Sequence, residues 1–154
     1  MSRYAVSGRN ELSGSSANVS VGAVLWNPHA SISLFVSALS FFTGSAAVAD
    51  IGITRSSSRG TPVASITPDL DNDFARRIAP ISGAVIDHNF GANNPTLVTT
   101  SPYLAIGYCV AVIYSGFSFV FNKPIEVPAG TGLALVTQVA SVIPAGNVTF
   151  VWDE

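Results

Sequence analysis

The chain has 154 residues, a length that predicts one domain with a substantial buried core. Only 10% of the residues are charged, against about 25% in an ordinary soluble domain. Seven basic and nine acidic side chains leave a net charge of −2, which is too small to argue for nucleic acid or a membrane surface as partner. Low charge with 48% apolar residues predicts that other subunits cover much of the surface. A compact, sparingly soluble β-domain is the alternative.

The N-terminal segment is rich in Ser, Gly and Asn. This composition predicts a flexible arm over residues 1–18, ahead of a single domain over residues 19–154. No apolar stretch of signal-peptide length is present, so we expect no secretion signal. The arm is expected to become ordered on a partner, because it carries two positive charges and two apolar side chains. These candidate partner contacts are Arg3, Tyr4, Val6 and Arg9.

Beyond the arm, short segments alternate apolar and polar residues, the period of a half-buried strand, and Gly, Pro or Asn separates them. The predicted strands lie at residues 19–26, 31–43, 47–54, 63–66, 84–86, 96–100, 103–114, 117–127, 133–136 and 147–152. Residues 69–77 alone have a helical pattern, of one or two turns, and residues 87–95 are expected to form a long loop. Such a chain is almost free of helix.

The second predicted strand, residues 31–43, is apolar on both faces. One face is expected to carry Ile32, Leu34, Val36 and Ala38, and the other Phe35, Leu39 and Phe41.

The segment 103–114 is the most apolar of all and reads as one long strand. Its large side chains share one face, namely Leu104, Ile106, Tyr108, Val110, Val112 and Tyr114. The opposite face is small, with Ala105, Gly107, Cys109 and Ala111, which suits close packing of a second layer.

The segment 117–136 predicts two strands joined by a corner at residues 128–132, where Pro and Gly supply turn geometry. We read it as a hairpin at the edge of a sandwich. Pro124 removes a backbone donor, so a central strand is not expected to run through it.

These elements predict a jelly-roll-like β-sandwich of about eight to ten short antiparallel strands. An immunoglobulin-type sandwich is disfavoured, because its Cys…Trp…Cys pattern is absent and Cys109 is the single cysteine.

The sequence contains no convincing catalytic or metal-binding pattern. Asp69, Asp71 and Asp73 resemble the start of an EF-hand, but Phe74 and Pro80 occupy the positions of its glycine and glutamate. Asp87-His88 is a conceivable acid–base pair without a nucleophile elbow elsewhere. We therefore expect a non-enzymatic protein without metal or cofactor.

The sequence also argues against nucleic acid, membrane and sugar as partners. Arg55 and Arg59 flank a serine-rich loop and are further candidate partner contacts, although two charges are too few for nucleic acid. The uncharged runs 30–49 and 103–121 approach membrane-spanning length, but Ser, Thr and Gly interrupt them and no Lys/Arg clusters flank them. Trp26, Trp152 and the tyrosines are able to stack on sugars, but the apolar alternation around Trp152 favours core packing.

Three stretches carry a resemblance to a known group of proteins. They are P-I-E-V-P-A-G-T-G-L near the C-terminus, the final N-V-T-F-V-W-D-E, and S-L-F-V-S-A-L-S-F-F-T-G-S-A-A-V-A-D-I-G-I-T-R followed by G-T-P. Over residues 31–154 the chain resembles the jelly-roll-like head decoration, or cement, proteins of tailed bacteriophages.

The resemblance implies a virion protein without catalytic residues, made in the host cytoplasm and bound on the capsid exterior across joints between major capsid protein subunits. We expect it to form a homo-oligomer, a dimer or trimer, with no nucleic acid or membrane as partner. The alternative is a carbohydrate- or receptor-binding module of a tail fibre.

Overall fold

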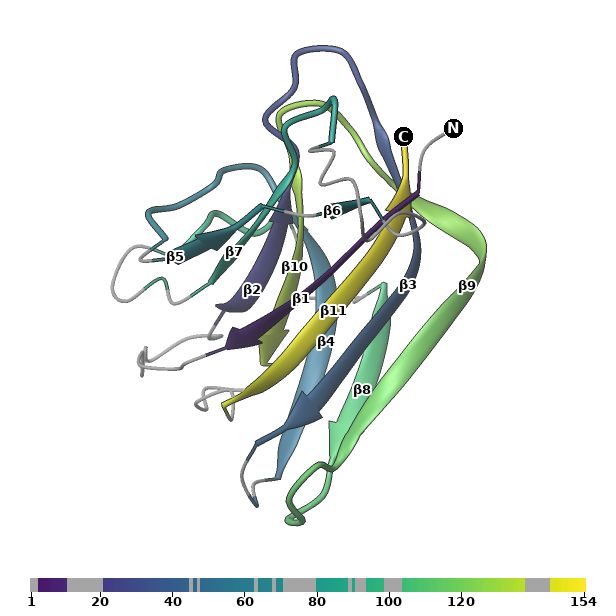
Figure 1. Cartoon of the computed structure of the whole chain (residues 1–154). Coiled ribbons are helices and arrows are strands. Elements are labelled where there is room, and N and C mark those ends of the chain that lie inside the picture. The colour runs from purple at the N-terminus through teal and green to yellow at the C-terminus, as the bar shows by residue number, and fades with distance from the viewer. Residues whose placement is uncertain are drawn as a thin grey trace.

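The computed structural model describes residues 3–10, 21–44, 46, 48–62, 64–67, 69–70, 80–88, 90, 94–98, 104–137 and 145–154. Within these residues the chain forms two antiparallel β-sheets that enclose an apolar core, and it contains no helix (Figure 1). The all-β sandwich predicted from the sequence is confirmed. No helix of the described part is long and apolar enough to cross a membrane.

The described residues contain eleven strands. In chain order these are β1 (Arg3–Asn10), β2 (Val21–Trp26), β3 (Leu34–Thr43), β4 (Ala49–Ser56), β5 (Ala64–Ile66), β6 (Asp69–Leu70), β7 (Val85–His88), β8 (Ala105–Cys109), β9 (Gly116–Val127), β10 (Gly132–Thr137) and β11 (Gly146–Asp153).

The strands pair in a nested order. The first sheet has the order β6-β1-β11-β3-β9, and the second has the order β5-β7-β2-β10-β4-β8. The first long strand pairs with the last, β2 with β10, β3 with β9 and β4 with β8. A long hairpin rolled up in this way is the jelly roll, and β5, β6 and β7 extend its sheets within the connection from β4 to β8.

The N-terminal segment is a strand of the sandwich, so the prediction of a flexible arm is wrong for residues 3–10. β1 pairs with β11 along its whole length, from Arg3 opposite Asp153 to Asn10 opposite Gly146. Tyr4 is only 1% exposed and stacks on Trp152, with ring centroids 5.8 Å apart. The pairing partner lies at the other end of the chain, so local composition gave no sign of it. Residues 1–2 and 11–18 lie outside the described residues.

A β-bulge in β3 explains why its two predicted faces do not persist. Leu34 and Val36 are buried before Ser37, but Leu39 and Phe41 are buried after it. The pairing of β3 with both neighbours skips Ser37, so the side-chain alternation changes phase there. Bulged residues carry no hydrophobic signature, and for this reason the periodicity placed Leu39 and Phe41 on the wrong face.

β8 is shorter than predicted, and its small face packs against the other sheet as expected. The strand ends at Cys109, and residues 110–115 form a turn before β9. A Cβ atom added to Gly107 would lie 2.2 Å from the ring of Phe117, so the two sheets approach too closely there for any side chain. Cys109 is fully buried beside it.

The segment of residues 116–137 is a corner between the two sheets, so the predicted hairpin is wrong. β9 pairs with β3 at the edge of one sheet, while β10 lies between β2 and β4 in the other. The Pro and Gly residues at 128–132 fit a hairpin within one sheet as well as a corner between two sheets. The buried side chain of Asn27 fastens the corner, because its Nδ2 donates to the carbonyl oxygens of Ile32 and Val127, at 2.8 and 3.1 Å. Pro124 lies in the edge strand, as predicted.

Three smaller predictions also change. Asp69 and Leu70, expected to begin a helix, form β6 and pair with β1, and residues 71–77 lie outside the described residues. The sequence predicts a loop at residues 87–95, but residues 87 and 88 belong to β7. In the predicted strand at residues 96–100, Leu97 forms an isolated bridge with Ser56, and residues 99–100 are not described.

We expect Tyr4→Ala to destabilise the protein by about 3–5 kcal/mol, the usual cost of truncating a buried aromatic side chain. The substitution leaves a cavity over Trp152 and removes the ring stacking. Arg3→Ala on the same strand is the control and should cost less than about 1 kcal/mol, because Arg3 is exposed. Urea unfolding measures both. Equal small losses would show that β1 does not contribute to the core.

We expect Gly107→Ala to destabilise the fold by about 1–3 kcal/mol, because the added methyl group overlaps the Phe117 ring and forces the sheets apart. Gly44→Ala is the matched control, since its nearest neighbour is the carbonyl oxygen of Ala145 at an ordinary 3.4 Å. Thermal unfolding of the two variants distinguishes them. An unchanged melting temperature for Gly107→Ala would contradict the close approach.

Candidate docking surface

Large apolar side chains are exposed along β8 and in the turn that follows it. We call this set the β8 surface. Its strand part consists of Leu104, Ile106 and Tyr108, and its turn part of Val110, Val112, Ile113 and Tyr114. Exposed apolar clusters of this extent mark interaction sites in soluble proteins.

The β8 surface follows directly from the packing of the core. Successive side chains of a strand point to opposite faces, and the inward face of β8 carries only the small residues Ala105, Gly107 and Cys109. The outward positions therefore carry the large side chains, where an antiparallel sheet with one solvated face ordinarily places polar residues. Ile106 and Tyr108 are each 54% exposed. The predicted large face is thus real, and it faces outward.

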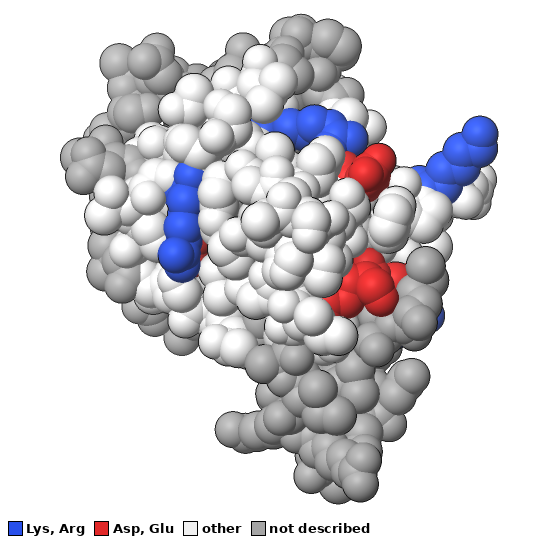
Figure 2. Space-filling view, turned by 90° about the horizontal axis from the view of Figure 1, so that it is seen from above, with Lys and Arg blue, Asp and Glu red and all other residues white. Residues whose placement is uncertain are grey.

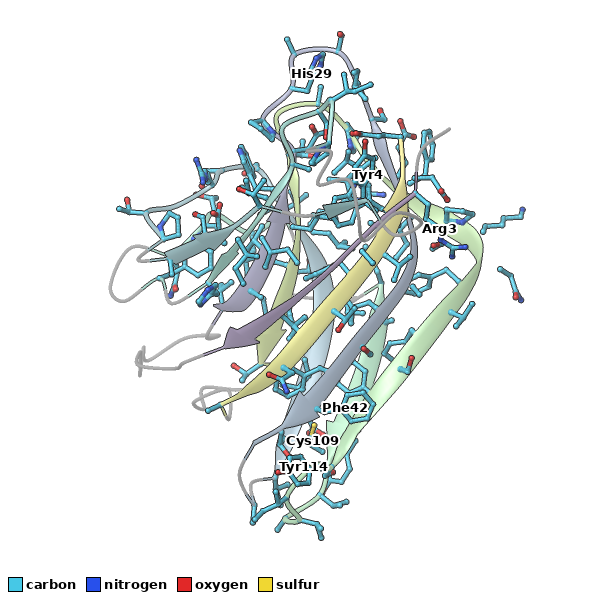
Figure 3. The ribbon with its side chains drawn as sticks, in the orientation of Figure 1. Arg3, Tyr4, His29, Phe42, Cys109 and Tyr114 are labelled. Atoms are coloured by element: carbon cyan, nitrogen blue, oxygen red, sulfur yellow. The ribbon has the colours of Figure 1, made fainter. Side chains whose placement is uncertain are left out.

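The turn after β8 is held against β3 by hydrogen bonds. The amide of Tyr114 donates to the carbonyl oxygen of Thr43 at 2.9 Å, and the amide of Thr43 donates to that of Ser115 at 2.8 Å. Within the turn, the amide of Val110 donates to Oγ of Ser115 at 2.8 Å. Phe42 and Val48, both exposed, belong to the neighbouring chain segments. Figure 3 shows Phe42, Cys109 and Tyr114 gathered at this end of the molecule.

Tyr114 has a conformation that is uncommon for its residue type. Its φ of 63° lies in the left-handed region, which costs a residue other than glycine about 1–2 kcal/mol. The hydrogen bonds of the turn maintain this conformation, and the ring is left 77% exposed. Tyr114 also borders a hollow of about 300 Å³ with Gly44, Ala145, Gly146 and Asn147. The turn therefore presents an exposed aromatic ring on a hydrogen-bonded backbone, beside a small depression.

The β8 surface is almost free of charge. Between Asp87 and Lys123 the sequence contains no Lys, Arg, Asp or Glu. Among the described residues that pair with β8, Asp50 is charged. It lies on β4, opposite Tyr108. At the other end of the sandwich, charged side chains are scattered over a mostly uncharged surface (Figure 2).

The predicted partner contacts do not gather at one site. Arg3 is exposed and donates to Oγ of Ser37 at 3.3 Å, whereas Tyr4 belongs to the core and is not available as a contact. Val6 and Arg9 lie farther along β1, opposite Phe150 and Asn147 of β11.

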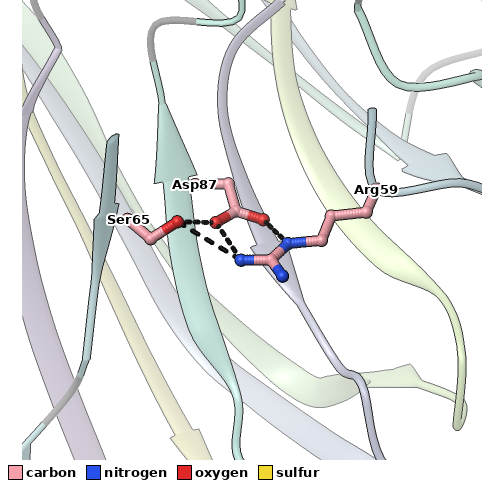
Figure 4. Close-up of polar contacts among 3 residues, drawn as sticks. All are labelled: Arg59, Ser65 and Asp87. Carbon is pink, nitrogen blue, oxygen red and sulfur yellow. Dashed lines mark hydrogen bonds and ion pairs between the residues drawn. The ribbon is translucent and has the colours of Figure 1, made fainter. Parts of the chain in front are cut away.

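The two arginines predicted in the serine-rich loop both make intramolecular contacts. The guanidinium of Arg55 donates to the carbonyl oxygen of Glu126. Arg59 forms a two-pronged ion pair with the fully buried Asp87, Nε to Oδ2 at 2.6 Å and Nη2 to Oδ1 at 2.9 Å, and Ser65 donates to the same carboxylate (Figure 4). The hydrogen bonds that Arg59 donates to the Asp87 carboxylate raise the pKa of Arg59. This pair anchors the loop after β4 to β7.

The structure gives no support to the conceivable acid–base pair. The carboxylate of Asp87 is engaged by Arg59 and Ser65, and His88 follows it in β7 with its side chain toward the opposite face. Burial raises the pKa of the Cys109 thiol, which disfavours the reactive thiolate. Among the residues that the structure describes, no three His, Cys, Asp or Glu side chains are grouped to hold a metal ion.

The two tryptophans are not presented to a sugar. Trp152 is fully buried in the main core, as its alternation predicted. Trp26 packs against a second apolar cluster, which includes Val24 and Phe90. Among the described residues, the exposed aromatic rings are instead those of Phe42, Tyr108 and Tyr114, at or beside the β8 surface.

Comparison with protein-family models, curated proteins and solved structures gives no match to this chain. The candidate surface therefore rests on the geometry and chemistry of its own residues. Sequence reasoning identified its large apolar side chains but named Arg3, Tyr4, Val6, Arg9, Arg55 and Arg59 as contacts instead. The signal that identifies the surface is the alternation of large with very small residues, since the small face has to be the one that packs.

We expect Arg59→Met to destabilise the protein by about 1–3 kcal/mol, because it leaves the buried Asp87 carboxylate without its main donor. The Arg59 side chain is 43% exposed, so water compensates part of the loss. Arg59→Lys keeps the charge but not the two-pronged geometry, and should lose less. Urea unfolding midpoints rank the three proteins. Equal midpoints would show that the pair contributes nothing to stability.

Proposed function

We propose that this protein is a non-enzymatic structural component of a virion that decorates the exterior of a capsid and binds across subunits of the major capsid protein. The observation that carries the proposal is the β8 surface, an uncharged apolar area at one end of a jelly roll. The centre of a protein–protein interface is depleted of charge and rich in such side chains.

The turn part of the β8 surface is the proposed contact with the capsid. Tyr114 and Ile113 project from a turn that hydrogen bonds hold against β3, so little conformational freedom is lost on binding. Tyrosine is enriched among the few residues that dominate interface energies. The neighbouring hollow is able to accept a side chain of the partner.

Binding to the assembled shell explains how such a protein stabilises a capsid without catalysing a reaction. A ligand that binds only the assembled state stabilises that state by mass action. A decoration protein seated across a joint therefore opposes separation of the capsid subunits under the pressure of packaged DNA. Jelly rolls occur in viral capsids and in lectins alike, so the fold supports the proposal but does not decide it.

The test uses virus particles purified from the natural source of this sequence, stripped of the protein and mixed again with recombinant protein. We expect Tyr114→Asn to weaken rebinding at least about 30-fold, the loss of one interface hot spot of about 2 kcal/mol. Asparagine tolerates the left-handed backbone, so the turn should keep its shape. Val120→Asn, at a position that is 79% exposed on β9, is the control and should bind like the unaltered protein.

Two results would contradict the proposal: particles that do not contain the protein, or full rebinding of the Tyr114→Asn variant. Specific binding to a glycan array, lost in the same variant, would instead support the receptor-binding alternative, because the exposed ring of Tyr114 is able to stack on a sugar.

A further inference from the structure

The two sheets end in four edge strands, and these differ in how they are protected. The edges are β6 and β9 in one sheet and β5 and β8 in the other. An edge strand presents backbone N–H and C=O groups that are able to pair with another chain. Proteins that stay separate block such edges with short strands, charges, proline or bulges.

Three of the four edges carry such protection. β6 has two residues, one of them Asp69, and β5 has three. β9 is long, but Lys123 and Pro124 lie within it, and its pairing with β3 is interrupted at Ser37. Proline has no backbone donor, and an exposed lysine opposes burial of the edge.

The β8 edge carries none of these features. Its five residues, Ala105–Cys109, contain neither proline nor charge, and the apolar Leu104 and Val110 flank them. It pairs with β4 on one side, and none of the described strands pairs with the other side. Its outward side chains, Ile106 and Tyr108, belong to the strand part of the β8 surface. An edge of this kind is suited to strand addition.

We propose that β8 pairs antiparallel with β8 of a second copy of this chain, about a two-fold axis, so that the second sheet continues from one subunit into the other. Antiparallel pairing of a strand with itself is self-complementary, as a two-fold dimer interface requires. Centred on Gly107, this pairing sets Ile106 against Tyr108 of the partner subunit, a favourable cross-strand pair of apolar side chains.

The charge distribution is consistent with a second copy as the occupant. The copies of Asp50 would be three strand spacings apart, at least about 14 Å, and salt screens charges beyond about 8 Å under physiological conditions. A stable interface buries about 800 Å² on each partner and involves 20–30 residues. The strand part of the β8 surface, the backbone edge and the exposed Val48 form the apolar centre of such an interface.

The isolated protein provides the test, by sedimentation across the micromolar range. We expect the unaltered chain at twice 15.9 kDa and Ile106→Lys at 15.9 kDa, because an outward lysine on the edge opposes its burial. Ile106 is half exposed and lies opposite Gly52, so the variant should fold normally, which circular dichroism checks. Val120→Lys on β9 introduces the same charge on the other sheet and should remain dimeric.

Amide hydrogen exchange provides a second readout. The β8 amides should exchange more slowly at high protein concentration than at low concentration, and this difference should disappear in Ile106→Lys. A monomer at all concentrations, a trimer, a dimeric Ile106→Lys, or β8 exchange that is independent of concentration would each overturn the proposal. No capsid is used in these measurements, so they stand or fall separately from the proposed function.

Discussion

The pairing of β1 with β11 is the constraint on which the rest of the sandwich depends. These strands come from the two ends of the chain, and the other principal pairs, β2 with β10, β3 with β9 and β4 with β8, are nested inside them. Without β1, one side of β11 would be an open edge and Trp152 would lose the ring of Tyr4 that covers it. The fold is therefore built on long-range contacts, which makes the loss of its first strand as serious as the loss of a central one.

Core packing and surface chemistry are linked at β8. The ring of Phe117 occupies the space over Gly107, so the inward face of this strand contributes little apolar volume to the core. The large side chains of the strand lie on its outer face, and the hydrogen-bonded turn continues that face as far as Tyr114. An interaction surface at this place is thus a direct consequence of how closely the two sheets approach.

Several charged and polar side chains of the described residues hold connections in place. Asp87 binds Arg59 and so fastens the loop after β4. The carboxylate of Glu154 accepts hydrogen bonds from the amides of Ile81 and Ser82, at 2.7 and 3.2 Å. Asn27 joins the loop after β2 to the corner after β9. Buried polar groups need partners, and here each partner belongs to a distant segment, which positions the connecting loops relative to the sheets.

The sequence by itself determined the fold class, most strand positions, the inward orientation of Trp152 and the division of β8 into a large and a small face. Period-two alternation and turn residues are local signals, and they survive folding unchanged. Only the tertiary structure decided that residues 3–10 pair with β11, that Ser37 shifts the alternation of β3, and that residues 116–137 cross between sheets. Each of these outcomes depends on which distant strand provides the neighbouring backbone and how much space it leaves, and no local pattern contains that information.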